Sequence, residues 1–308
     1  MLSRGTTWAV GGVMLSIARK LPERGREYFL GYASPLMLFL TAVLWLIGIV
    51  AGFALFGWGV SRMPLNEHAL GNIYSLRRAD IGLSAAAWLS TFLLLVAFTV
   101  HLVSVTSAYS RRERLISRLT AQATRTPDAE AVFAEYTRGG CRDHLGALFS
   151  EWADWLADIQ ATHLAYPALV HYRSGGSFCW TNAAQIMLDC AALAEACVPN
   201  WAPPETRSLL NVGERCLPRI AARLGIDLPP VPVSYQGRET YPFSRSLAEI
   251  RTAGLSIEVD DEDAQLAFQR LRVRYAPFAN AICERLLYEY METLDGNRTD
   301  TGDDTVIR

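Results

Sequence analysis

Two apolar stretches decide the fold of this 308-residue chain: residues 34–60, SPLMLFLTAVLWLIGIVAGFALFGWGV, and residues 81–110, IGLSAAAWLSTFLLLVAFTVHLVSVTSAYS. Apart from His101, neither stretch contains an acidic or basic side chain. Each exceeds the roughly 20 residues that an α-helix needs to cross a bilayer. The sequence therefore predicts a transmembrane helical hairpin in a lipid bilayer, with spans at about 34–60 and 81–110 and an outer loop at 61–80.

Basic residues flank both predicted spans and indicate their orientation, because Lys and Arg near short loops resist transfer across a membrane. The leading flank contains Arg19, Lys20, Arg24 and Arg26, and the trailing flank contains Arg111, Arg112, Arg114 and Arg118. The loop between the spans contains Arg62, Arg77 and Arg78. We expect a multi-pass protein of the inner or plasma membrane with both termini cytoplasmic.

Residues 1–33 form a basic N-terminal segment, in which residues 6–18 are apolar but too few to span. A cleaved signal peptide would have a similar short apolar region. Cleavage would place the basic cluster at residues 19–26 on the far side of the membrane, against the charge rule, so we favour a short interfacial helix.

Residues 111–308 have the composition of a cytosolic protein and a helical pattern of apolar residues. The predicted fold is all-α, with the two-span hairpin followed by a cytosolic helical bundle. Apolar periodicity and breakers place helices after Pro127, over 145–159, 178–197 and 203–224, and from 260 to about 294 with a kink at Pro277. A proline-rich strap at 226–244 and a disordered tail from about residue 296 complete this domain.

Small residues recur at helical spacing within both spans: Gly48 and Gly52 in the first, and Gly82, Ala86 and Ser90 in the second. Such stripes let helix backbones approach closely, either within the hairpin or between subunits of a homo-oligomer. His101 lies in the inner half of the second span, where it could gate or sense pH, or could reach the lipid headgroups.

Candidate sites for chemistry are weak, and we expect no enzyme, no cofactor and no metal site. Cys179, Cys190 and Cys197 share a helical stripe near His163 and His171, which suits zinc, but buried cysteines are common in protein cores. The acidic run at 260–263 suits a helix N-terminus better than a cation site. Phosphate-loop, serine-hydrolase and zinc-protease motifs are all missing, and Lys20 is the only lysine.

Several segments resemble a bacterial family of potassium-channel-like membrane proteins that carry a helical cytosolic domain after the second span. The resemblance rests on residues 17–22, 35–36, 45–58, 109–113, 163–167, 171–174, 188–193, 271–272 and 275–278. It implies a tetrameric pore lined by the second span, with a T-x-G-Y-G filter in a re-entrant loop between the spans. Residues 61–80, SRMPLNEHALGNIYSLRRAD, contain one glycine and no threonine, so a potassium filter of that kind is absent.

We therefore expect a degenerate or non-selective ion-channel subunit for a monovalent cation, with the second span at the pore, or a truncated copy of a conducting parent. The alternative is a membrane-anchored scaffold or signalling adaptor, in which the spans tether a helical domain that binds a protein partner. No nucleic acid partner is expected.

Overall fold

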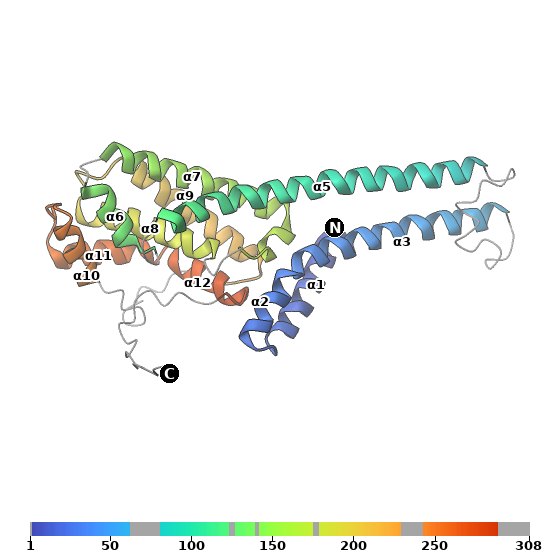
Figure 1. Ribbon diagram of the computed structural model, residues 1–308, viewed down its shortest axis with the longest axis horizontal. Helices are drawn as coiled ribbons and strands as arrows, with labels where there is room; N and C mark the ends of the chain where they lie inside the picture. Colours follow the sequence, from blue (N-terminus) through green and yellow to red (C-terminus); the bar gives the residue numbers. More distant parts are fainter. Residues whose placement is uncertain are drawn as a thin grey trace, which may run out of the picture. The chain divides into compact units, whose positions relative to one another are not determined.

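The computed structural model is all-α in the residues that it describes, which are 2–61, 81–122, 127–138, 142–174, 179–228 and 243–288. These residues form 11 α-helices and one short 3-10 helix (Figure 1). The predicted outer loop beyond residue 61, most of the proline-rich strap and the predicted disordered tail lie outside them. The chain divides into two compact units, which are taken separately below.

The first unit comprises residues 1–114 and 161–175. It contains α1 (Leu2–Ala18), α2 (Glu23–Gly31), α3 (Ala33–Ser61), most of α5 (Ile81–Gln122) and the 3-10 helix η1 (Pro167–His171). Both α3 and α5 are long and apolar enough to cross a membrane, as predicted for the two spans. Helix α5 continues beyond the predicted span at 81–110 as far as Gln122, and no glycine or proline interrupts residues 111–122.

Short helices cover the start of α3 and the later part of α5. Met14 of α1 packs against Ala33 and Met37 of α3. A second apolar cluster joins one residue of α3, two of α5 and two of η1: Leu38, Val105, Ala108, Ala168 and Leu169. The 3-10 helix follows α7 (Arg142–Ala165), because Pro167 disfavours the α conformation at the residue before it.

The second unit comprises residues 115–160 and 176–308 and is built around α8 (Trp180–Cys197). Every residue of α8 except Glu195 is buried. Besides most of α7 and the end of α5, five further described helices belong to this unit: α6 (Ala129–Arg138), α9 (Glu205–Arg223), α10 (Phe243–Thr252), α11 (Asp261–Arg272) and α12 (Ala276–Arg285). Four of them, α6, α9, α11 and α12, pack directly on α8, so the core of this unit surrounds a single central helix.

One prediction about this unit was wrong, and one helix was not predicted. The single kinked helix expected over 260–294 is two helices, since the chain turns at Val273–Tyr275 and Pro277 lies in the first turn of α12, where its missing N–H costs nothing. Helix α10 was not predicted, although Phe243, Leu247 and Ile250 form its buried face at helical spacing.

Candidate functional site

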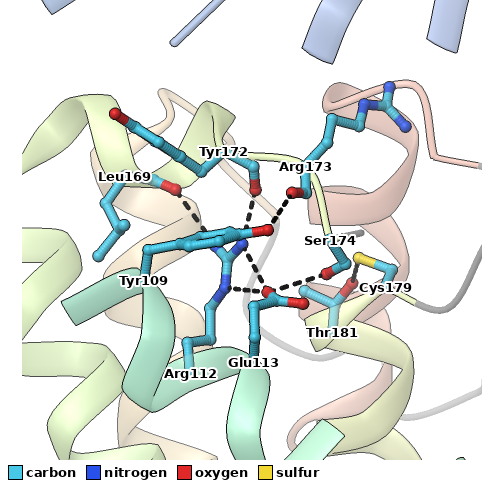
Figure 2. Close-up of polar contacts among 9 residues, drawn as sticks. All are labelled: Tyr109, Arg112, Glu113, Leu169, Tyr172, Arg173, Ser174, Cys179 and Thr181. Atoms are coloured by element: carbon cyan, nitrogen blue, oxygen red, sulfur yellow. Dashed lines mark hydrogen bonds and ion pairs between the residues drawn. The ribbon is translucent and has the colours of Figure 1, made fainter. Parts of the chain in front are cut away.

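The most polar buried site of the first unit lies where α5 meets the segment after η1 (Figure 2). The 3-10 helix ends at His171, and the Leu169 carbonyl oxygen accepts from the Tyr172 N–H. A carbonyl oxygen has two lone pairs and can accept a second hydrogen bond, and the carbonyls of Tyr172 and Arg173 lie beyond the helix. Tyr109 and Arg112 of α5 donate to carbonyl oxygens of this segment, and Glu113 of α5 accepts from its Ser174 hydroxyl. We call this group the Arg112 cluster, which consists of Tyr109, Arg112, Glu113, Leu169, Tyr172, Arg173 and Ser174.

Arg112 is the centre of the cluster and only 1% of it is exposed. Its guanidinium donates from Nη1 to the Leu169 carbonyl oxygen at 3.2 Å and from Nη2 to the Tyr172 carbonyl oxygen at 2.6 Å. Its Nε donates to Oε1 of Glu113 at 2.9 Å. The charge of this buried arginine is thus balanced by one carboxylate and two carbonyl dipoles, as burial of a cation requires.

Two further hydrogen bonds close the Arg112 cluster. The Tyr109 hydroxyl donates to the Arg173 carbonyl oxygen at 3.0 Å, and the Ser174 hydroxyl donates to Oε1 of Glu113 at 3.1 Å. The Tyr109 ring lies 5.2 Å from the Arg112 guanidinium carbon, close enough for a cation–π contact. One oxygen of Glu113, Oε1, accepts from both Arg112 and Ser174. This carboxylate is therefore better placed to hold two segments together than to exchange protons with a substrate.

Burial also affects the neighbouring tyrosine. Desolvation raises the pKa of Tyr172 above its usual value of 10.0, and the nearby Tyr109 raises it further. The two rings lie 5.4 Å apart in a tilted arrangement. Tyr172 therefore stays protonated at physiological pH. Its ring contributes apolar packing, and its backbone oxygen accepts a hydrogen bond from Arg112.

The small residues that were predicted to pack helices lie on the surface of the described chain. No described atom lies within 4 Å of a Cβ placed on Gly48, Gly52 or Gly82. Ala86 is exposed and Ser90 is half-buried. Packing of the hairpin through the three glycines therefore has no partner atoms here, and association between subunits stays a prediction.

His101 contacts the aromatic residue between α7 and η1. Its ring contacts Tyr166 edge-on, with 5.5 Å between ring centroids. A role in gating or pH sensing stays a prediction, as does the alternative that it reaches the headgroups.

The cysteines of the predicted zinc stripe are buried thiols. Cys179 is the N-cap residue of α8, and Cys190 and Cys197 lie within the helix. Among the described residues, no group of three His, Cys, Asp or Glu side chains is placed to hold a metal ion. Burial raises the pKa of the Cys197 thiol to about 12, and that of Cys190 well above 9.0 with smaller contributions from Glu130 and Asp189.

A second buried polar group fastens α11 and α12 to α8 in the second unit. Oδ1 of Asp189 accepts from Nε of Arg272 at 3.1 Å and from the Tyr275 hydroxyl at 2.6 Å. Sequence reasoning did not identify this pairing, although all three residues lie in segments that carry the family resemblance. The acidic run lies where it was predicted, with Asp260 as the N-cap and Asp261–Asp263 in the first turn of α11.

Neither models of protein families, nor curated proteins, nor solved structures give a match to this chain, so no family is identified for it.

Proposed function

We propose that this chain is a two-span integral membrane protein that holds a helical interaction domain at the cytoplasmic face of the membrane. The exposed apolar surface of α3 and α5 carries this proposal. Phe39 and Phe56 of α3 are 62% and 63% exposed, and Phe92 and Val103 of α5 are 61% and 63% exposed. Continuous apolar surface of this extent is unstable in water, and lipid is the environment that it fits.

The hydroxyl groups of α5 support the same environment. Thr91, Thr99, Ser104 and Thr106 each donate to the carbonyl oxygen four residues earlier, at 2.9 Å. A hydroxyl that faces hydrocarbon has no water to bond, so a backbone acceptor within the same helix satisfies it at little cost.

The ends of the long helices support the proposed orientation. Arg19 and Lys20, which follow α1, and Arg111 and Arg114 of α5 are exposed on the first unit. Lys and Arg at this end of both spans favour a cytoplasmic location for both termini. The proposal assigns no catalytic activity to the chain; the second unit would act by binding a protein partner, as a scaffold or adaptor does.

A channel subunit is the second candidate, and the Arg112 cluster is the observation that favours it. The cluster fastens α5 just beyond its apolar part to residues 169–174. A displacement of that segment would therefore be passed to the helix that the family resemblance places at a pore. In this reading several copies surround a non-selective path for monovalent cations, and the loop at 61–80 contributes no potassium filter.

Arginine substitutions on the exposed face of α5 test the membrane proposal. Leu93 and Val100 are 56% and 61% exposed, so Leu93→Arg with Val100→Arg would be harmless in a water-soluble protein. Within a bilayer each arginine costs about 3 kcal/mol at the centre of a span. We expect the double variant to be lost from the fraction that resists alkaline carbonate extraction. Leu266→Arg, on the 45% exposed Leu266 of α11, is the matched control and should stay in it. Wild-type protein found in the soluble fraction would contradict the proposal.

Cation flux separates the two candidate activities. Purified protein is reconstituted into liposomes, and potassium and sodium flux are followed as protein content rises. An adaptor gives no flux above that of empty liposomes, and it tolerates exchange of residues 81–103 for an unrelated apolar helix. Flux that rises with protein content and disappears after this exchange would establish the channel instead.

A further inference from the structure

Two buried thiols of the second unit share one hydroxyl group. Oγ1 of Thr181, in the first turn of α8, lies 2.9 Å from Sγ of Cys179 and 2.7 Å from Sγ of Cys283 in α12. Figure 2 shows Cys179 and Thr181 with the first of these contacts drawn. Cys179 is 1% exposed, Thr181 is fully buried and Cys283 is 2% exposed. The two cysteines are 104 residues apart in sequence, yet their sulfur atoms contact the same hydroxyl oxygen.

The side-chain amide of Asn182 also contacts the Cys283 thiol. Sγ of Cys283 donates to Oδ1 of Asn182 at 3.3 Å. Asn182 is only 7% exposed, and its Nδ2 is buried without a hydrogen-bond partner among the described residues. An unsatisfied buried donor costs free energy, and a half-turn of the amide would point that donor at the Cys283 sulfur. A thiolate at Cys283 could then accept from both Asn182 and Thr181, near the positive end of the α8 dipole.

The other cysteines described in this unit have no such surroundings. Burial raises the pKa of the Cys216 thiol to about 12, and its Sγ donates to the Leu156 carbonyl oxygen at 3.3 Å. Burial likewise raises the pKa of Cys197 to about 12. The thiolate is the nucleophilic form of cysteine, so a thiol with a raised pKa reacts slowly. Cys197 and Cys216 therefore serve as internal controls for the oxidation of Cys179 and Cys283.

We propose that Cys179 and Cys283 form an oxidisable dithiol, which a hydroperoxide converts into a disulfide that ties the start of α8 to α12. The hydroperoxide is a co-reactant from outside the protein. This inference is independent of the proposed membrane function, because it concerns only contacts within the second unit.

The chemistry balances over two steps. The Cys283 thiolate attacks one oxygen of hydrogen peroxide, the O–O bond breaks, and Cys283 becomes a sulfenic acid while the departing hydroxide takes up a proton to form water. The Cys179 thiol then attacks the sulfenic sulfur, an S–S bond forms, the S–O bond breaks, and a second water leaves with the Cys179 proton. Two thiols thereby give two electrons to one peroxide.

Disulfide mapping of the full-length protein tests this proposal. The chain is purified in detergent, treated with hydrogen peroxide, denatured in N-ethylmaleimide, digested without reduction and analysed by mass spectrometry. We expect a Cys179–Cys283 linked peptide, with Cys190, Cys197 and Cys216 recovered as alkylated thiols. Recovery of both Cys179 and Cys283 as alkylated thiols after peroxide has oxidised other cysteines would overturn the proposal, as would linkage of either one to a different cysteine.

Variants then test the surroundings of the pair. Thr181→Val keeps the shape of the side chain but removes the shared hydroxyl, and we expect the linked peptide to form about tenfold more slowly. Cys216→Ala is the matched control and should leave the rate unchanged. Equal rates in wild type and Thr181→Val would show that the hydroxyl plays no part. The wild-type map decides whether the disulfide forms even if a variant does not fold.

Discussion

The Arg112 guanidinium donates to the backbone oxygen of Tyr172, 60 residues later in the chain, across 2.6 Å. This bond joins two of the segments that carry the family resemblance, residues 109–113 and 171–174. The buried Arg112 cation is therefore stable only while η1 and the residues that follow it lie against α5. The residues after η1, 172–174, have no regular secondary structure of their own. The two parts of the first unit stabilise each other at this point.

Arg112→Met should destabilise the first unit. Methionine retains the apolar stem but leaves the Leu169 and Tyr172 oxygens without their charged donor, at a cost of about 3 kcal/mol. Thermal unfolding in detergent should show a lower midpoint. Arg111→Met is the matched control on the exposed side of the same helix, where the expected change is within about 0.5 kcal/mol. Equal midpoints for the two variants would contradict this role for Arg112.

The Asp189 ion pair gives a parallel prediction for the second unit. Asp189→Asn removes the buried carboxylate charge that faces Nε of Arg272, so the free energy of unfolding should fall by about 3–5 kcal/mol in urea titrations. The double variant Asp189→Leu with Arg272→Met should lie closer to wild type, because no isolated charge remains.

An exposed pair supplies the control for this prediction. Arg251 and Asp261 lie 2.6 Å apart, but their side chains are 54% and 50% exposed. Asp261→Asn should therefore cost less than about 1 kcal/mol. A loss as large as that of Asp189→Asn would show that burial is not what makes the Asp189 pair important.

Larger residues in place of the exposed glycines of α3 test whether this face of the helix mediates subunit association. A Cβ added at Gly48 or Gly52 has no described atom within 4 Å, so we expect Gly48→Ile with Gly52→Ile to leave the fold of one copy unchanged. If this face pairs with another copy, the side chains hold the backbones apart, and association should weaken about tenfold. Cross-linking in detergent measures the change. Leu46→Ala, on the opposite side of α3, should leave association unaltered, and an equal effect of both changes would exclude a glycine-mediated contact.

The raised pKa of Cys216 predicts a loss of stability at high pH. Between the ordinary value of 9.0 and about 12 the unfolded thiol is ionised while the folded thiol is not, so the folded state holds one more proton. The free energy of unfolding should therefore fall with rising pH, by about 1.4 kcal/mol per pH unit for this group. Urea titrations from pH 8 to 12 measure the slope.

Cys216→Ala should flatten that slope, whatever its effect on stability at neutral pH. Leu209→Ala, which truncates another fully buried residue on α9, should lower the whole curve without changing its slope. Parallel curves for wild type and Cys216→Ala would contradict a raised thiol pKa.

Local sequence signals predicted the parts of the fold that depend on neighbouring residues. The spans follow from apolar composition over 27 and 30 consecutive residues. Helix α6 begins after Asp128 as predicted, because its Oδ1 accepts from the Ala131 N–H at 2.7 Å. Helix α9 stops before Gly225, which takes the positive φ of 69° that glycine adopts without strain.

Pairings between distant segments could not be predicted in this way. The partners of Arg112 are backbone oxygens, which every residue possesses, so no residue type identifies them. Thr181 and Cys283 are 102 residues apart, and only the packing of α12 on α8 brings them together. Asp189 was noticeable as a charge within an apolar helix, but Arg272 is one of several arginines that could have reached it.

The 3-10 helix also determines how much of α5 a bilayer can touch. The apolar residues 81–110 would measure about 45 Å as a helix, well beyond a hydrocarbon core of about 30 Å. Ala168 and Leu169 cover Val105 and Ala108, so the apolar surface left for lipid ends near Val103 and measures about 35 Å. That residual length differs from the bilayer by an amount that a modest tilt absorbs. In the proposed membrane arrangement, η1 thus removes most of the hydrophobic mismatch that the composition of α5 implies, and it limits how deeply this end of α5 enters the bilayer.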